Sequence, residues 1–212
     1  MHRIPLYMLI LLSLLGCSAR STDAKMRTGG RLVFEDDFER KNIGNAWLDT
    51  GGGYRIIDGA LRIRGARNKP LWLKQKLPRD ARVEFTARSE STEVDIKAEF
   101  FGDGRSRAEH ASYTATSYVV ILGGWNNKRS IIARMNEHGD DRVVRDSPKG
   151  IPGKTYRFAV ARKGEMFRWY LNDELFLDMT DTDPLAGNGH EYFAFNNWES
   201  EVFFDDFRVF EL

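Results

Sequence analysis

The chain has 212 residues, of which 32 are Lys or Arg, 31 are Asp or Glu, and one is Cys. This length suits one β-sandwich domain or two small domains, and it is sufficient to bury a hydrophobic core. The nearly balanced charge argues against a nucleic-acid partner, because nucleic-acid-binding proteins usually carry a clear basic excess. A single Cys excludes an internal disulfide framework and a Cys-based zinc site.

The N-terminus has the pattern of a targeting signal. A basic start, Met1-His2-Arg3, precedes mostly apolar residues at 4–15. A membrane-spanning helix needs about 20 apolar residues, so this stretch is too short to span and fits a secretory signal instead. Leu14-Leu15-Gly16-Cys17 resembles the lipobox of bacterial lipoproteins. The resemblance implies that residues 1–16 are a lipoprotein signal peptide and that Cys17 is lipidated; an ordinary signal peptide with an incidental Cys is the alternative.

A lipid anchor would place the protein in the bacterial cell envelope. Acyl chains contribute about 0.8 kcal/mol per buried CH2, so a multiply acylated Cys17 would hold the protein on a membrane without a helix. Ser18 stands where an Asp favours inner-membrane retention in the Gram-negative pattern, so the resemblance implies the outer membrane. Residues 17–30 are mostly small or polar and are predicted to form a flexible tether.

From Arg31 onward the hydrophobic residues alternate with a period of two, which is typical of strands. Val83, Phe85 and Ala87, for example, fall on one face. No stretch shows a long helical periodicity. We predict strands at residues 31–35, 54–57, 60–64, 71–73, 82–88, 94–100, 117–123, 130–135, 142–145, 156–162, 166–171, 174–179, 191–196 and 201–211. This spacing predicts one all-β domain at 31–212, built as an antiparallel two-sheet β-sandwich or a barrel.

The two ends of this domain are similar in sequence. Residues 33–38 read Val-Phe-Glu-Asp-Asp-Phe, and residues 202–207 read Val-Phe-Phe-Asp-Asp-Phe. We expect the first and last strands to lie side by side in one sheet, because pairing protects strand edges that would otherwise aggregate.

Several motifs follow one another along the domain. They include Tyr-Arg-Ile-Ile-Asp-Gly-Ala-Leu at 54–61, Trp-Tyr-Leu-Asn-Asp-Glu-Leu at 169–175 and Phe-Asp-Asp-Phe-Arg-Val at 204–209. This order resembles the concanavalin A-like lectin/glucanase superfamily, including its laminin-G-like and 3-keto-glycoside-hydrolase branches. The resemblance implies a jelly roll whose concave face commonly meets carbohydrate, although a fold alone does not establish a function.

Paired carboxylates at 93–99 are the first candidates for catalysis. The segment Glu93-Val94-Asp95-Ile96-Lys97-Ala98-Glu99 resembles the Glu-x-Asp-x-Glu motif of laminarinase-type glucanases, whose two Glu are nucleophile and acid/base. Along a strand Glu93 and Glu99 would lie roughly 20 Å apart, too far to flank one glycosidic bond. Glu93 and Asp95, about 7 Å apart on one face, could flank it. The alternative is a solvated strand face of alternating charges.

His138 is a further catalytic candidate. It lies in a turn-like run of polar residues and could act as a general base, with Arg134 nearby, or as one ligand of a divalent ion. No His pair has the spacing of a zinc site. If the protein is an enzyme, these groups point to a glycoside hydrolase or a polysaccharide lyase; an ordinary surface His is the alternative.

Two Trp-Asn segments are candidates for sugar contacts, at residues 125–127 and 195–198. Sugars are bound by aromatic rings against their C–H faces and by amides against their hydroxyls. The alternative is that the Trp side chains are buried anchors and the Asn residues form turns. The expected ligand contacts are Tyr118, Trp125, Asn127, Arg134, Asn197 and Trp198.

The resemblance also suggests a structural Ca2+, because jelly-roll sugar-binding modules often hold one near their terminal strands. Asp36 and Asp206 are the candidate ligands, since calcium prefers carboxylate oxygens. Ordinary edge carboxylates are the alternative, and no cofactor is required for binding.

Together these features predict a lipid-anchored cell-envelope domain that binds carbohydrate. The alternatives are a glycoside hydrolase or lyase of the same fold, or a non-catalytic domain that contacts another protein. The sequence identifies neither the glycan nor a protein partner.

Overall fold

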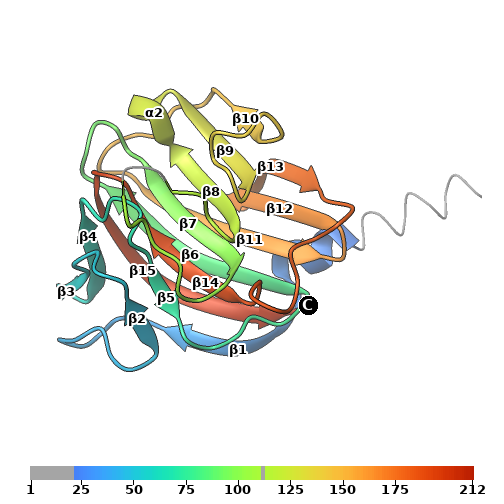
Figure 1. The fold of residues 1–212 in the computed structure, drawn as a ribbon, viewed down its shortest axis with the longest axis horizontal. Coiled ribbons are helices and arrows are strands. Elements are labelled where there is room, and N and C mark those ends of the chain that lie inside the picture. Colours follow the sequence, from blue (N-terminus) through green and yellow to red (C-terminus); the bar gives the residue numbers. More distant parts are fainter. Residues whose placement is uncertain (1–21, 111–112) are drawn as a thin grey trace, which may run out of the picture.

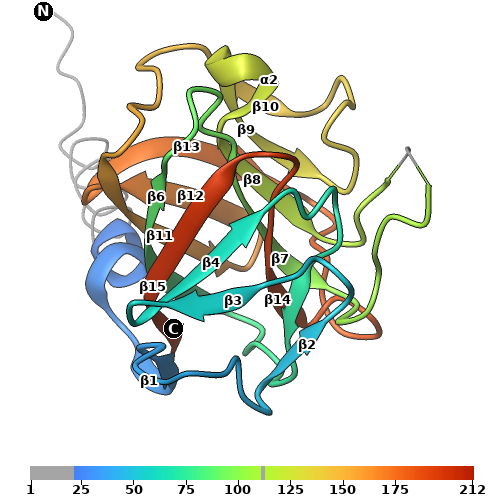
Figure 2. The same ribbon diagram turned by 90° about the vertical axis from the view of Figure 1, so that its left-hand side faces the viewer.

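The computed structural model describes residues 22–110 and 113–212. Two antiparallel sheets lie face to face (Figures 1 and 2), which confirms the predicted all-β sandwich. The signal peptide at 1–16 and the lipidation candidate Cys17 lie outside the described residues. In the ranges that the structure describes, no helix is long and apolar enough to cross a membrane.

The first sheet has eight strands. Their bounds are β1 (Arg31–Asp36), β3 (Arg55–Ile57), β4 (Ala60–Arg64), β6 (Ala81–Ser89), β11 (Thr155–Lys163), β12 (Met166–Leu171), β13 (Glu174–Thr180) and β15 (Glu201–Glu211). They are ordered β13-β12-β11-β6-β15-β4-β3, and β1 pairs with β15. The first and last strands therefore lie side by side as predicted, with Asp36 opposite Phe207.

The second sheet has seven strands. Their bounds are β2 (Trp47–Asp49), β5 (Leu71–Leu73), β7 (Ile96–Gly102), β8 (Tyr118–Gly123), β9 (Arg129–Arg134), β10 (Val143–Arg145) and β14 (Tyr192–Asn196). They are ordered β10-β9-β8-β7-β14-β5-β2. The outer face of this sheet, which points away from the first sheet, carries the site described below.

The core fills the space between the two sheets with aromatic and branched side chains. On β6 the alternation predicted from the sequence holds, since Val83, Phe85 and Ala87 are all buried. Phe85 stacks on Phe158 of the neighbouring strand at 4.8 Å between ring centroids, and it meets Phe195 of the other sheet edge to face at 5.4 Å. Such aromatic pairs contribute about 0.5–1.5 kcal/mol beyond the area that they bury.

The N-terminal segment differs from the predicted flexible tether. Residues 22–28 are helical and lie against the first sheet (Figure 2). Met26 is fully buried, and the Asp23 carboxylate accepts hydrogen bonds from Arg168 at 2.7 Å and Tyr170 at 2.6 Å. The prediction is wrong for this part of the tether, because one apolar and one acidic side chain dock the segment onto β12.

Candidate functional site

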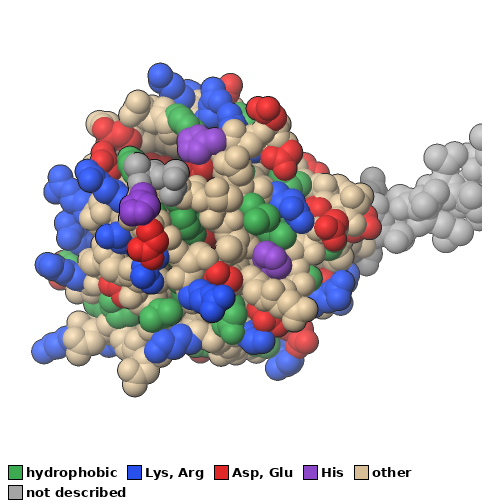
Figure 3. Space-filling model, in the orientation of Figure 1, with side chains coloured by type: hydrophobic (Ala, Val, Ile, Leu, Met, Phe, Trp, Pro, Cys, Tyr) green, Lys and Arg blue, Asp and Glu red, His purple; other side chains and the backbone are tan. Residues whose placement is uncertain are grey.

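A cleft of about 880 Å³ lies at the outer face of the second sheet, where β7 and β8 meet the loops at 91–95, 136–138 and 198–200. Figure 3 shows that acidic and basic side chains are interspersed over one face of the molecule. The residues that line the cleft and could bind a ligand are Arg64, Asn68, Glu93, Asp95, Tyr113, Trp125, Asn126, Glu137, His138, Trp198 and Glu199.

Trp125 enters the cleft from α2 (Gly124–Asn127), a single turn after β8. Trp125 has φ 53° and Asn126 has φ 57°, a left-handed conformation that costs a bulky residue roughly 1–3 kcal/mol. The Asn127 amide holds this turn, because it donates to the Gly150 carbonyl at 2.7 Å and accepts from the Gly150 amide at 3.0 Å. The strained turn therefore presents the half-buried Trp125 indole to the cleft.

Trp198 enters the same cleft from the loop between β14 and β15. Its side chain is 41% exposed, whereas its neighbour Asn197 is fully buried. The Asn197 side chain accepts from the Ala66 amide at 3.0 Å and donates to the Ser200 carbonyl. In both Trp-Asn segments, the Trp faces the cleft and the Asn fixes the loop that carries it.

Four of the expected ligand contacts therefore have other roles. Asn127 and Asn197 are occupied by backbone groups, as described above. Tyr118 is fully buried between the sheets, and its hydroxyl donates to Asp181 at 2.6 Å. Arg134 pairs with the same Asp181 carboxylate at 3.0 Å. These contacts hold the loop after β13 and lie outside the cleft.

The three catalytic candidates, Glu93, Asp95 and His138, all line the cleft. Val94 and Asp95 have φ 60° and 45°, so the chain turns before β7 begins and the predicted extended spacing does not apply. Asp95 is half-buried and accepts a hydrogen bond from the Trp198 amide at 3.1 Å. Burial raises the pKa of Asp95 to about 6, although the charge of Lys97 opposes the shift.

A buried cation lies beside these carboxylates. The Lys97 side chain is 2% exposed; its ammonium donates to Asn68 at 2.7 Å and forms an ion pair with Glu137. The other oxygen of Glu137 lies 3.6 Å from the His138 ring nitrogen. Glu137 therefore links the buried Lys97 ammonium to His138 in the lining of the cleft.

Glu99 is sealed beneath the cleft. It is fully buried, and it accepts hydrogen bonds from Ser117 at 2.6 Å, Asn196 at 2.6 Å and Tyr113 at 3.1 Å. Burial raises the pKa of Glu99, and these donors oppose the shift only in part. Lys97 and Glu99 are both buried, so the alternative of a solvated strand face is wrong for these two residues.

No sequence pattern predicts Tyr113, Glu137 or Arg64, which also line the cleft. Glu137 precedes His138 in the same polar run, and that adjacency is the one signal that could have found it. Tyr113 lies in a long loop between β7 and β8 without a recognisable pattern.

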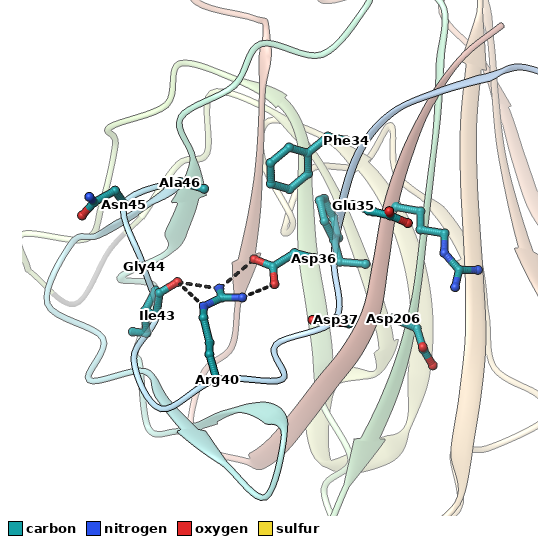
Figure 4. A pocket seen from close by; sticks show the side chains of 12 residues that line it. Phe34, Glu35, Asp36, Asp37, Arg40, Ile43, Gly44, Asn45, Ala46 and Asp206 are labelled. Carbon is teal, nitrogen blue, oxygen red and sulfur yellow. Dashed lines mark hydrogen bonds and ion pairs between the residues drawn. The ribbon is translucent and has the colours of Figure 1, made fainter.

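Asp36 and Asp206 do not form a calcium site. Asp36 points toward Arg40, while the side chain of Asp206, on β15, points away from Asp36 (Figure 4). Asp36 also accepts from the Trp47 indole at 2.7 Å, so its oxygens are already paired. Calcium needs six to eight oxygens, and the described ranges contain no group of three or more His, Cys, Asp or Glu that could hold a metal ion.

Solved structures with the same fold include proteins that bind or cleave carbohydrates. The carbohydrate-binding module CBM66 from Bacillus subtilis superposes with a TM-score of 0.61 at 14% identity, over 80% of this chain and 98% of its own. The catalytic domain of an endo-1,3-β-glucanase (laminarinase) from Thermotoga petrophila gives 0.57 at 14% identity, over 86% and 98%. The endo-β-1,3-glucanase from Pyrococcus furiosus gives 0.58 at 13% identity, over 86% and 95%.

These likenesses show that the chain has the concanavalin A-like jelly-roll fold, as the resemblance implied. No protein-family model and no curated protein matches the sequence. At 13–14% identity the shared property is the fold, which carries both sugar-binding modules and glycoside hydrolases.

Proposed function

We propose that this protein binds a carbohydrate in the cleft on the second sheet. The observation that carries the proposal is that Trp125 and Trp198, from loops more than 70 positions apart in the sequence, enter one cleft. In each loop a neighbouring Asn is used to fix the backbone rather than to line the cleft. The protein thus holds two aromatic side chains in place before a ligand arrives, which lowers the entropic cost of binding.

The chemistry of the cleft suits a sugar. A pyranose ring has apolar C–H faces that pack on indoles and hydroxyls that exchange hydrogen bonds with carboxylates and Arg. Trp125 and Trp198 can pack against the C–H faces. The sugar hydroxyls can form hydrogen bonds with Asp95, Glu93 and Arg64. Neighbours of the same fold that bind or cleave glycans support this assignment.

A glycan array tests the proposal. The full chain, purified in a non-ionic detergent, should bind at least one glycan, and Trp198→Ala should weaken that binding at least tenfold, because interface Trp residues commonly contribute 2 kcal/mol or more. Leu48→Ala is the matched control, since Leu48 is 40% exposed on β2 and does not line the cleft. Failure to bind any glycan, or equal loss in the two variants, would refute the proposal.

A glycoside hydrolase is the second candidate, favoured by one observation. Asp95 has a pKa of about 6 and lines the cleft with Glu93 and Glu137, so it could donate a proton while another carboxylate stays ionised. Release of reducing sugar from a bound glycan, abolished in Asp95→Asn, would establish hydrolysis. Binding without release would leave the protein as a binding module.

We further propose that the domain is held at the bacterial outer membrane by lipid on Cys17. Support comes from the lipobox-like residues 14–17 and from Ser18. Mass spectrometry of the mature N-terminus should find an acylated Cys17, and Cys17→Ala should release the protein from the membrane fraction. An unmodified N-terminus at another residue would exclude the anchor.

A further inference from the structure

More carboxylates than cations line the cleft itself. Four carboxylates line it, from Glu93, Asp95, Glu137 and Glu199, against one guanidinium, from Arg64. Two of the four have a cation of their own, because Glu137 pairs with Lys97 and Glu199 with Arg67. Among the described residues, Glu93 and Asp95 have no ion-pair partner, so they remain available to a ligand.

The aromatic side chains add a second, independent preference for positive charge. The face of an indole is electron-rich and attracts cations within about 6 Å of its centre. The Trp125 ring already has cations of the protein beside it, since Arg142 lies 5.5 Å and Arg129 lies 5.9 Å from its centroid, so the preference for a ligand cation depends on Trp198. Trp198 is 41% exposed, and its backbone amide is bonded to the Asp95 carboxylate, so the backbone of the residue that carries this indole is tied to a carboxylate that lines the same cleft.

From these two features we infer that the glycan recognised by this cleft contains amino sugars with free, protonated amines. An ammonium group would pair with Asp95 and Glu93 and pack against the Trp198 indole, while the rest of the ring makes the contacts described above. A uronic acid would be repelled by the same carboxylates. This inference rests on the proposed carbohydrate function and names the class of sugar that it requires.

The environment of Asp95 agrees with this assignment. The charged groups that act on it are Lys97, Glu137 and Glu93, and His138 lines the same cleft. The two Glu side chains add to the effect of burial in disfavouring the ionised form of Asp95. A ligand ammonium would offset that repulsion. Binding should therefore release a proton from Asp95, and affinity for the amino sugar should rise as the pH increases from 5 to 6, while the ligand amines stay mostly protonated.

The test compares two matched ligands on the full chain in non-ionic detergent. Titration of a glucosamine hexamer and of the N-acetylglucosamine hexamer at pH 6.5 and low salt compares cationic and neutral forms of one sugar. We expect the glucosamine hexamer to bind at least tenfold tighter, and this ratio to fall at 0.5 M NaCl, because salt screens charge attraction. Oligogalacturonate should not bind.

Two variants test whether a carboxylate of the cleft causes the preference for the glucosamine hexamer. Glu93→Gln should reduce the ratio of the affinities for the two hexamers at least threefold. Glu93 is exposed, so the fold should tolerate the change. Asp178→Asn on β13 is the control, since it removes an exposed carboxylate outside the cleft and should leave the ratio unchanged.

The outcomes separate this inference from the proposed function. Equal or tighter binding of the N-acetylated hexamer, or of oligogalacturonate, would overturn the amino-sugar inference while carbohydrate binding stands. An unchanged ratio in Glu93→Gln would overturn it as well. Failure of every glycan in the array would refute both.

Discussion

Two hollows in this protein are built from the same kinds of residue but differ in how their polar groups are paired. The first, of about 540 Å³, lies beside the closing strands β1 and β15 (Figure 4). At its wall, Asp36 receives hydrogen bonds from Arg40, from the Trp47 indole at 2.7 Å and from the Phe38 amide at 3.0 Å. Arg40 in turn donates to the Ile43 carbonyl. These groups satisfy one another and fix the loop after β1.

The second hollow is the cleft on the other sheet. Within the described ranges, the Asp95 carboxylate there receives one hydrogen bond, from the Trp198 amide, and the cation that acts on it, Lys97, is paired with Glu137. The pKa values reflect the contrast: burial would raise the pKa of both carboxyls, but Arg40 and Trp47 lower that of Asp36, whereas that of Asp95 rises to about 6. Unused polar capacity beside the half-buried Trp125 and the exposed Trp198 therefore distinguishes the proposed binding cleft from the structural hollow at Asp36.

Removing Asp36 should have the largest effect on the fold. Asp36→Ala leaves the buried Trp47 N–H without its acceptor, which costs about 1–3 kcal/mol. Loss of the pair with the exposed Arg40 and of the bond from the Phe38 amide adds to this cost. Urea unfolding should show this loss, while Asp37→Ala, at the exposed neighbouring position, should cost less than about 1 kcal/mol. Similar losses in the two variants would mean that the pairing around Asp36 does not stabilise the first hollow.

Asp95→Asn should have the opposite effect on stability and raise the free energy of unfolding at neutral pH. The pKa of Asp95 is raised from 3.8 to about 6 in the folded protein, so its favourable contribution is present below pH 3.8 and is lost as the pH rises through 6. The Asn side chain cannot ionise and still accepts from the Trp198 amide. We expect a gain of about 1–3 kcal/mol in the free energy of unfolding at pH 7.5, and no gain at pH 3.5.

Urea unfolding at the two pH values measures this difference. Stabilisation combined with weaker glycan binding would identify Asp95 as a residue kept for function at a cost in stability. A variant that is less stable than the parent at pH 7.5 would show that the cleft carboxylate is structural, and the contrast between the two hollows would fail.

The sandwich could be predicted because its cause is local. Alternation at Val83, Phe85 and Ala87 determines which side chains meet in the core, and the Asp58-Gly59 pair supplies positive φ values of 51° and 76° for the hairpin turn between β3 and β4. The three-residue strand β2 was missed, because it is too short to show an alternating pattern.

The site could be predicted only in part, because its arrangement depends on distant backbone groups. The sequence singled out Trp125 and Trp198, but it could not show that Asn127 bonds to Gly150 or that Asn197 bonds to Ala66. An amide beside a Trp is chemically suited both to a sugar and to a loop. Which of these it contacts is decided by chain segments that lie far away in the sequence.

The same reasoning explains the carboxylates. Glu93, Asp95, Lys97 and Glu99 alternate in the sequence as a solvated face would, yet Lys97 and Glu99 are buried. Their partners come from the loop that contains Tyr113, from Glu137 and from β14. Local periodicity specifies the face on which a side chain lies, but not what covers that face.

A substitution of Glu199 should have the smallest effect on ligand preference, and it tests whether pairing with a cation removes a carboxylate from ligand binding. Glu199 lines the cleft but pairs with Arg67 at 2.8 Å, and both side chains are more than half exposed, so the pair contributes less than about 0.5 kcal/mol to stability. Because Arg67 already neutralises it, Glu199→Gln should change the preference for a glucosamine over an N-acetylglucosamine hexamer less than twofold, whereas Glu93→Gln changes it at least threefold. If the two variants behave alike in the same titration, the number of carboxylates around the cleft determines ligand choice, and their pairing with cations within the protein does not.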